Sequence, residues 1–125
     1  MYEEYLNAQI EMMRDNDPSA DRLAGLATPQ QAELTAADVA MTVAQGIRTE
    51  GSFRVTLVEQ VSIESARLEA YVCIDNSAVM VIDDAAGTRE PASPADPVRV
   101  LFEIRDKPLV DYEDAVPAAA DLRCP

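Results

Sequence analysis

Histidine and tryptophan are missing from this sequence, and glycines and cysteines are few. Without histidine, the chain lacks the commonest side chain for proton transfer near neutral pH and the commonest ligand of transition metals. Two cysteines alone cannot build a structural zinc site, which takes four ligands. The four glycines stand apart from one another, so a glycine-rich phosphate-binding loop is excluded. We therefore expect no metal site and no cofactor.

Basic residues are also scarce: 10 stand against 23 acidic ones, which gives a net charge of −13. Such a chain repels the phosphates of nucleic acids and anionic lipid headgroups. The close basic pair Arg105 and Lys107 is flanked by Glu103 and Asp106, so it forms no basic patch. We expect no nucleic-acid partner. The charge is interpreted as a source of solubility, with docking to a basic partner as the alternative.

The acidic residues form small groups, which raises the question of calcium. Asp83 and Asp84 are adjacent, and Asp111, Glu113 and Asp114 lie close together. Neither group follows the alternating ligand pattern of a calcium-binding EF-hand loop. We interpret both groups as solvated side chains.

Long hydrophobic runs are absent as well. No segment approaches the about 20 apolar residues that a membrane-spanning helix needs, and the acidic opening Met1–Glu4 is unlike the basic start of a signal peptide. The length of 125 residues is that of one domain, and the hydrophobic fraction of 48% is enough for a core. We expect one domain over residues 1–125, with no transmembrane segment.

Helical periodicity runs through the first third of the chain. Apolar residues recur every three or four positions from Tyr2 to Met13, which predicts a helix that ends near Asp15. Asp17 followed by Pro18 is typical of a helix start, and predicts a second, short helix. These two segments belong to a helical part over residues 1–46.

A third helix is predicted after Thr28, which has the spacing of a capping box with Gln31. It is expected to end at Gly46, a residue that readily adopts the left-handed conformation of a helix end. Its predicted buried face consists of Leu34, Ala37, Met41 and Ala44.

From Gly51 onward the pattern changes to the alternation of strands. Strands are predicted at 53–57, 68–74, 79–82, 98–104 and 109–112, with turns at 62–65, 75–77 and 83–87. The proline-rich stretch up to Pro97 is expected to be a loop or a sheet edge. Helices followed by antiparallel strands predict an α+β fold, with the sheet over 51–116 and a tail over 117–125. Short turns favour an antiparallel meander of neighbouring strands.

One face of the predicted sheet carries mixed charges, from Arg67, Glu69, Arg99, Glu103 and Arg105. Such a face fits either contact with solvent or a polar interface. The two cysteines, Cys73 and Cys124, are either unrelated thiols or one disulfide, and their spacing leaves both alternatives open.

Several spaced residues carry a resemblance to a known family. They are Tyr2, Tyr5 and Leu6 at the start, Gly46 after the long helix, Cys73, Asp75 and Ser77 after an alternating strand, Asp84 and Gly87, and a cysteine near the C-terminus. With the order of elements, they resemble the cone-shaped, cystatin-like fold of the nuclear transport factor two-like superfamily. More narrowly, the chain is similar to small secreted proteins and lipoproteins of high-GC Gram-positive bacteria and their mobile elements.

The resemblance implies that Cys73 and Cys124 form a disulfide. An oxidised pair in turn implies an extracytoplasmic location, secreted or anchored to the envelope, because cytosolic thiols are kept reduced. One feature departs from the family: its members often have a tryptophan at the start of the last strand, where this chain has Lys107-Pro108. That departure leaves the register of the last strand open.

Enzymes of this superfamily work inside the cone. The resemblance therefore makes Tyr5, Tyr71 and Asp75 candidate pocket residues, with Arg67 as an electrostatic partner, and a buried carboxylate there would act as a general base if its pKa were raised. The residues themselves favour structural roles. Asp75 begins an Asp-Asn-Ser sequence that is typical of turns, and Tyr71 has the position of a cross-strand packing residue. We assign no catalytic residue.

Two functional hypotheses follow. The first is a non-catalytic extracytoplasmic domain that binds another protein or self-associates. The alternative is a domain that binds a small apolar molecule, or an isomerase- or cyclase-like enzyme that uses the cone pocket. A cavity of about 300 Å³ or more, lined by apolar groups and with a converging carboxylate, would favour the alternative. A filled cone with an exposed apolar or mixed patch would favour protein binding.

Overall fold

The computed structural model describes residues 2–93, 97–116 and 124 of the chain. The helices are α1 (Tyr2–Arg14), a short 3-10 helix η1 (Ala20–Leu23) and α2 (Pro29–Ala44). The strands are β1 (Ile47–Gly51), β2 (Arg54–Glu64), β3 (Arg67–Asp75), β4 (Val79–Asp83), β5 (Thr88–Pro91), β6 (Val98–Ile104) and β7 (Pro108–Ala115). Helices precede antiparallel strands, so the predicted α+β class is confirmed. The predicted tail lies outside the described residues, apart from Cys124.

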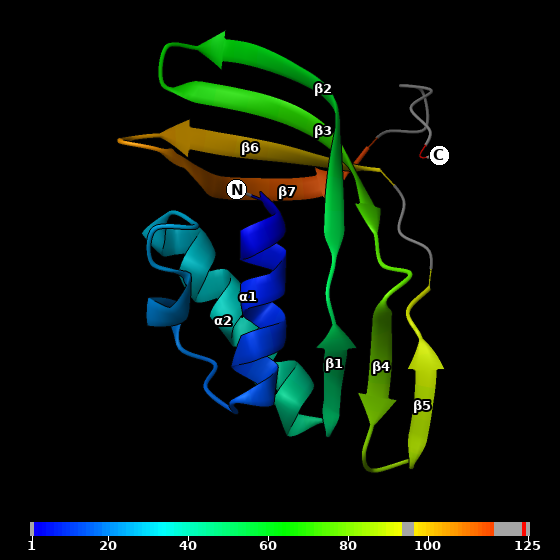
Figure 1. The fold of residues 1–125 in the computed structure, drawn as a ribbon. Helices are drawn as coiled ribbons and strands as arrows, with labels where there is room; N and C mark the ends of the chain where they lie inside the picture. Colours follow the sequence, from blue (N-terminus) through cyan, green and yellow to red (C-terminus); the bar gives the residue numbers. More distant parts are fainter. Residues whose placement is uncertain (1, 94–96, 117–123, 125) are drawn as a thin grey trace.

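The strands form two sheets, with the orders β1-β4-β5 and β2-β3-β6-β7. The predicted pairing of neighbouring strands is confirmed for β2–β3, β4–β5 and β6–β7, but a continuous meander is wrong: β3 pairs with β6, and β4 belongs to the other sheet. Figure 1 shows the reason, since β1 runs on into β2 and β3 runs on into β4, with a bend in each ribbon. Because of these bends, β1 and β2 belong to different sheets, and so do β3 and β4. β6 pairs with the edge of β3 that β4 does not occupy.

Gly51 makes one of these bends. It has a φ of 102°, and a Cβ added there would lie 1.9 Å from the carbonyl oxygen of Ala78. Only glycine allows the two backbones to approach so closely. The predicted start of the sheet at Gly51 is thus corrected, because β1 begins at Ile47 and Gly51 ends it.

Two further boundaries differ from the sequence prediction. The turn predicted at 62–65 is shorter and later, since β2 continues to Glu64 and the turn is Ser65-Ala66. The proline-rich stretch contributes β5, an edge strand that pairs with β4. The register of the last strand, which the sequence left open, places Pro108 opposite Ile104.

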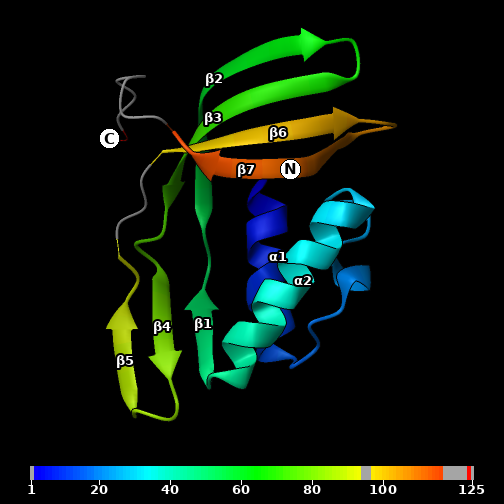
Figure 2. The same ribbon diagram turned by 180° about the vertical axis from the view of Figure 1, so that it is seen from behind.

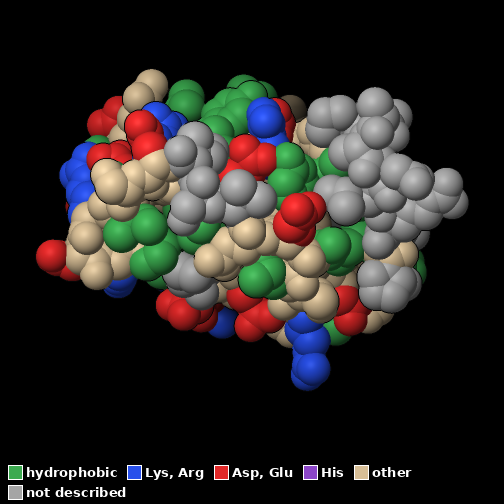
Figure 3. Space-filling view, turned by 90° about the horizontal axis from the view of Figure 1, so that it is seen from above, with side chains coloured by type: hydrophobic (Ala, Val, Ile, Leu, Met, Phe, Trp, Pro, Cys, Tyr) green, Lys and Arg blue, Asp and Glu red, His purple; other side chains and the backbone are tan. Residues whose placement is uncertain are grey.

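Both long helices lie on the same side of the four-stranded sheet and beside β1, as the two opposite views in Figures 1 and 2 show. The core fills the space between helices and strands. Its largest fully buried side chains are Tyr5, Met12, Leu23, Val39, Val79, Val100 and Val110. The opposite side of the sheet lies toward the viewer in Figure 3, where acidic, basic and hydrophobic side chains are interspersed.

The start and the end of α2 agree with the sequence prediction. The Thr28 side chain accepts a hydrogen bond from the backbone N–H of Gln31 at 3.4 Å, and Gly46 has a φ of 77°. The short helix differs in detail, because its cap is Ser19 and not Asp17. Asp17 instead pairs with Arg22.

The predicted buried face of α2 is wrong. Leu34 and Met41 are 58% and 62% exposed, and the other two predicted residues are exposed as well. The residues that are buried instead are Gln31, Ala32, Thr35, Ala36 and Val39. Small alanines let the helix approach its neighbours closely. The polar members of this face are buried because they form hydrogen bonds to Tyr5.

Candidate functional site

The structure does not bring the four predicted pocket residues together. Tyr5 is completely buried in the core. Tyr71 lies on the face of β3 that is turned away from the core, and a hydrogen bond to Glu69 raises its pKa. Asp75 accepts a hydrogen bond from the backbone N–H of Ser77 at 3.0 Å. The pKa of Asp75 is lowered chiefly by a hydrogen bond from the Ser77 side chain. Both contacts with Ser77 are those of a turn residue. Each of the three therefore has a separate environment.

Arg67, the fourth candidate, forms an ion pair with Asp111, with 3.3 Å between Nη2 and Oδ2. The other carboxylate oxygen of Asp111 accepts a hydrogen bond from the Thr28 hydroxyl at 3.0 Å. Arg67 thus helps to connect β3, β7 and the start of α2. This role is structural.

A polar cluster that the sequence did not predict surrounds Tyr5. The Tyr5 and Thr35 hydroxyls lie 2.5 Å apart, and the Gln31 side chain donates to Tyr5 at 3.1 Å. Glu113 of β7 accepts hydrogen bonds from Tyr2 at 2.5 Å and from Tyr5 at 3.3 Å. The cluster therefore joins α1, α2 and β7.

The two tyrosines of this cluster stay protonated. Burial, followed by the charge of Glu113, raises the pKa of Tyr5 to about 12, and the same two causes raise the pKa of Tyr2 further. Both hydroxyls are therefore neutral donors at physiological pH. Because its oxygens accept from both tyrosines, Glu113 is held as a structural acceptor.

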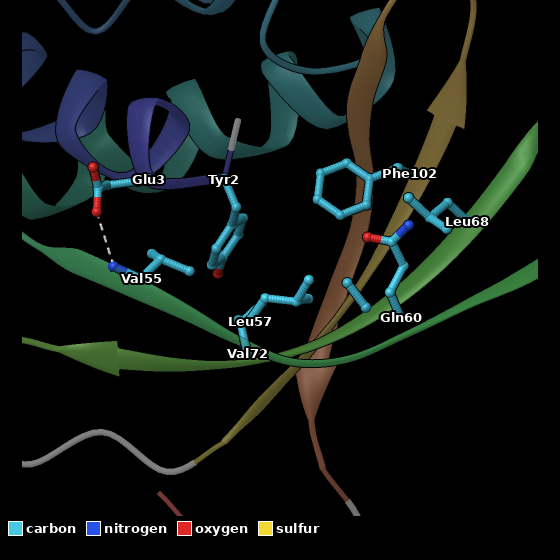
Figure 4. A pocket seen from close by; sticks show the side chains of 9 residues that line it. Tyr2, Glu3, Val55, Leu57, Gln60, Leu68, Val72 and Phe102 are labelled. Carbon is cyan, nitrogen blue, oxygen red and sulfur yellow. Dashed lines mark hydrogen bonds between the residues drawn. The ribbon is translucent and has the colours of Figure 1, made fainter. Parts of the chain in front are cut away.

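A pocket of about 250 Å³ opens next to this cluster, between the start of α1 and the inner face of the four-stranded sheet. Its walls are mostly apolar: Tyr2 from α1, Val55 and Leu57 from β2, Leu68, Ala70 and Val72 from β3, and Phe102 from β6, with Glu3 and Gln60 as the polar members. Figure 4 shows the Tyr2 ring extending from the start of α1, with Phe102 of β6 and with Leu57 and Gln60 of β2 around the same space.

Alternation along β3 explains how the pocket arises. Leu68, Ala70 and Val72 are buried, while Arg67, Glu69 and Tyr71 between them are half-buried on the opposite face. Small Ala70 lies at the middle of this row, where a larger side chain would fill the space. Tyr2 belongs to both features: its ring lines the pocket, and its hydroxyl donates to Glu113 in the polar cluster.

The polar groups of the pocket are few. Glu3 Oε1 accepts a hydrogen bond from the backbone N–H of Val55 at 2.9 Å, as the dashed line in Figure 4 marks. Gln60 is exposed at the rim. Leu57, at the mouth, is 53% exposed. The arrangement offers an apolar surface that one side chain or a small apolar group could fill.

Cys73 and Cys124 are joined as a disulfide, with 5.5 Å between their Cα atoms. The bond thus connects β3 to the end of the chain, in agreement with the pairing that the resemblance implies. Cys73 follows Val72, a residue of the pocket wall. Within residues 2–93, 97–116 and 124, no group of three or more acidic or cysteine side chains could hold a metal ion. In the same part of the chain, no helix has the length and apolar character to span a membrane.

Comparison with known proteins leaves the family open: no family model and no curated protein matches this chain. Among solved structures, the chain is similar to the intermembrane space region of the chloroplast protein ARC6, with a TM-score of 0.66. The match covers 94% of this chain and 95% of that one, at 9% sequence identity. The likeness is one of fold.

Proposed function

We propose that this chain is a non-catalytic, extracytoplasmic binding domain that receives an apolar side chain of a partner protein. The binding site is the pocket between Tyr2 of α1 and the inner face of β2, β3 and β6. The observation that carries the proposal is the apolar lining of this pocket, which opens to solvent beside the exposed Leu57. Removing such an apolar surface from water against a partner is favourable, and it offsets part of the entropy that association costs.

The chemistry of the pocket favours binding over catalysis. A general base needs a carboxylate or a similar group within hydrogen-bond reach of a substrate. Glu3 is engaged with the backbone of Val55, and Glu113 is engaged with the two tyrosine hydroxyls. The isomerase- or cyclase-like alternative would need one of these carboxylates to be released.

The size and surroundings of the pocket favour a protein partner over a small molecule. Its volume is about 250 Å³. Sites for small molecules typically have volumes of about 300–1,000 Å³, so this pocket is smaller than most of them. Apolar side chains are also exposed at the mouth of the pocket, since Leu57, which lines it, is 53% exposed and the adjacent Val58 is 45% exposed. A partner protein can fill the pocket and cover these neighbours at the same time.

We further propose that the two sheets form the cone of the nuclear transport factor two-like superfamily. The bent ribbons β1–β2 and β3–β4, each shared between both sheets, support this assignment. The extracytoplasmic location is supported by the disulfide. The similar structure from ARC6 is an intermembrane space region, which is compatible with such a location.

Site-specific photo-cross-linking tests the proposed function. Leu57 is replaced by benzoylphenylalanine in the protein produced in its source organism, and adducts are identified after irradiation. The matched control carries the same group at Met41, an exposed position of α2 that does not line the pocket. We expect a polypeptide adduct at position 57 that is absent at position 41.

A pocket-filling variant completes the test. Ala70→Phe places a large side chain inside the pocket, so capture at position 57 should fall at least tenfold while the protein remains folded. Polypeptide capture that is equal at both positions, or unaffected by this variant, would contradict the proposal. A small-molecule adduct in place of a polypeptide would favour the alternative function.

A further inference from the structure

The outer edge of β2 is open to pairing with another strand. In the four-stranded sheet, β2 and β7 are the edge strands. The edge of β7 is covered, because Val110 exchanges backbone hydrogen bonds with the segment before α2: its N–H donates to Leu26 and its C=O accepts from Thr28, both at 2.9 Å. No such backbone cover of β2 is found among the described residues. An uncovered edge presents N–H and C=O groups that can pair with another strand.

Side chains of α1 cover the beginning of this edge. Asn7 accepts from the N–H of Phe53 at 2.8 Å and donates to its C=O at 3.1 Å. Glu3 accepts from the N–H of Val55 at 2.9 Å. Because the outward-facing backbone groups of a strand recur at every second residue, those of Leu57 come next. No side chain of α1 is seen to cover the backbone of Leu57 within the described part of the chain.

The pairing of β2 with β3 identifies the next outward residue. The register shifts by one residue between Leu57 and Glu59, which leaves Val58 as a bulge. After such a shift the alternation restarts, so Gln60 follows Leu57 as the next outward-facing residue. Leu57 and Gln60 also line the pocket, together with Val55 of the same strand.

The outer edge of β2 lies beside the pocket, because Leu57 and Gln60 belong to both. Residues directly opposite one another on neighbouring strands direct their side chains to the same face of the sheet. A strand added beside β2 would therefore direct the side chain opposite Leu57 toward the inner face, where the pocket opens. Backbone pairing would supply affinity, and the pocket would select the side chain.

Charge favours a basic partner over a second copy of this chain. Glu59 and Glu64 of β2 are exposed, and Glu3 lies at the pocket. The chain has a net charge of −13. Two copies joined through β2 would bring these acids together, which is unfavourable for like charges on neighbouring strands. Lysine or arginine side chains on the added strand would be attracted.

We propose that an extended, basic segment of the partner protein pairs with the edge of β2 at Leu57 and Gln60, and inserts one apolar side chain into the pocket. This inference rests on the proposed function, and it adds the partner's conformation and charge. Pocket binding without strand pairing remains distinguishable from it, because only strand pairing depends on the partner's backbone N–H groups.

The test uses a fluorescein-labelled heptapeptide, Lys-Val-Lys-Leu-Lys-Val-Lys, and the full chain, with binding followed by fluorescence anisotropy. A second peptide has the same sequence with N-methyl groups on alternate residues of one edge, which removes backbone donors and keeps every side chain. A third has glutamate in place of each lysine. We expect binding of the basic peptide that is at least tenfold weaker for each of the other two.

Variants of Leu57 give an independent measurement. Leu57→Ala removes the side chain, and Leu57→Pro removes the outward N–H as well, which an edge strand tolerates. We expect at least fivefold weaker peptide binding for Leu57→Pro than for Leu57→Ala, with folding checked by circular dichroism. If Leu57→Pro fails to fold, the comparison of the methylated and unmethylated peptides still tests whether binding depends on backbone hydrogen bonds.

Two results would overturn strand pairing. The first is equal binding of the methylated and unmethylated peptides; if Ala70→Phe then abolishes that binding, the pocket function stands alone. The second is no binding of the basic peptide at all, in which case photo-cross-linking at position 57 decides the proposed function separately.

Discussion

The Tyr2 hydroxyl donates a hydrogen bond of 2.5 Å to Glu113 Oε2 and thereby joins the first turn of α1 to the last strand. The same carboxylate accepts from Tyr5 at 3.3 Å, and the two tyrosine rings lie 5.8 Å apart. One side chain of β7 thus holds two aromatic residues of α1. Because the Tyr2 ring is part of the pocket wall, Glu113 positions that wall.

Replacing this carboxylate should destabilise the protein. Glu113→Gln keeps the size of the side chain, but its amide nitrogen cannot accept a hydrogen bond from a hydroxyl. We expect a loss of about 1–3 kcal/mol in the free energy of unfolding, the usual cost of leaving a buried donor unpaired. Urea denaturation measures it. Glu90→Gln, at an exposed position of β5, is the matched control and should change stability by less than about 0.5 kcal/mol.

Stability should also fall at alkaline pH. The pKa of Tyr5 is raised from 10.0 to about 12 in the folded protein, and that of Tyr2 is raised too. The folded state therefore keeps protons that the unfolded chain releases above pH 10. This contribution to stability is complete below pH 10 and is lost as the pH rises toward 12.

The pH effect can be isolated by comparing the wild type with a Tyr2→Phe, Tyr5→Phe double variant. Tyr71 and Tyr112 are common to both proteins, so their titration cancels in the difference. Unfolding free energies at pH 9, 10 and 11 should decline more steeply in the wild type. Parallel declines would show that the two buried hydroxyls do not cause the effect.

Gly51→Ala tests the bend between the sheets. The new Cβ would meet the carbonyl oxygen of Ala78, and the φ of 102° is unfavourable for alanine. We expect a destabilisation of more than about 2 kcal/mol. Gly87→Ala is the control: it has a φ of 69° but open space around it, so about 1 kcal/mol is expected. Equal costs for the two variants would contradict the close approach.

Reduction of the disulfide should lower stability strongly. The bond between Cys73 and Cys124 closes a sequence separation of 51 residues. In the chain-entropy model, a loop of this length contributes about 4 kcal/mol. Urea denaturation with and without dithiothreitol measures the difference, and mass spectrometry of non-reduced, alkylated protein counts the free thiols. Two alkylated cysteines in non-reduced protein would remove the basis for the extracytoplasmic location.

Local signals in the sequence predicted local structure well. Thr28 and Gln31 are three residues apart, and their cap depends only on that spacing. Gly46 likewise ends α2 because of its own conformational freedom. The order of helices and strands follows from periodicity, which is also a local property.

The buried face of α2 could not be predicted by the same means. Leu34 and Met41 are apolar and helically spaced, yet they are exposed. The helix instead buries Gln31 and Thr35, whose partner Tyr5 lies on another helix. Hydrophobicity alone assigns the wrong face when long-range hydrogen bonds make polar residues the better-buried ones.

The inward position of Glu113 could not be predicted from the sequence, also because it depends on long-range pairing. In β7 the register shifts, so that Val110 lies opposite Phe102 while Tyr112 lies opposite Leu101. The extra residue, Asp111, reverses the alternation and puts Glu113 on the inner face, opposite the buried Val100. A strand without this bulge would place Glu113 outside, where the acidic residues around it are expected.

Methyl NMR spectroscopy of the labelled protein, titrated with the basic heptapeptide, tests the central claim most directly. If the pocket receives an apolar side chain, the largest shift changes will fall on the methyl groups of Val55, Leu57, Leu68 and Val72, and Ala70→Phe will abolish them. Shift changes that fall instead on Leu34 and Met41 of α2, or that persist in Ala70→Phe, would contradict the account.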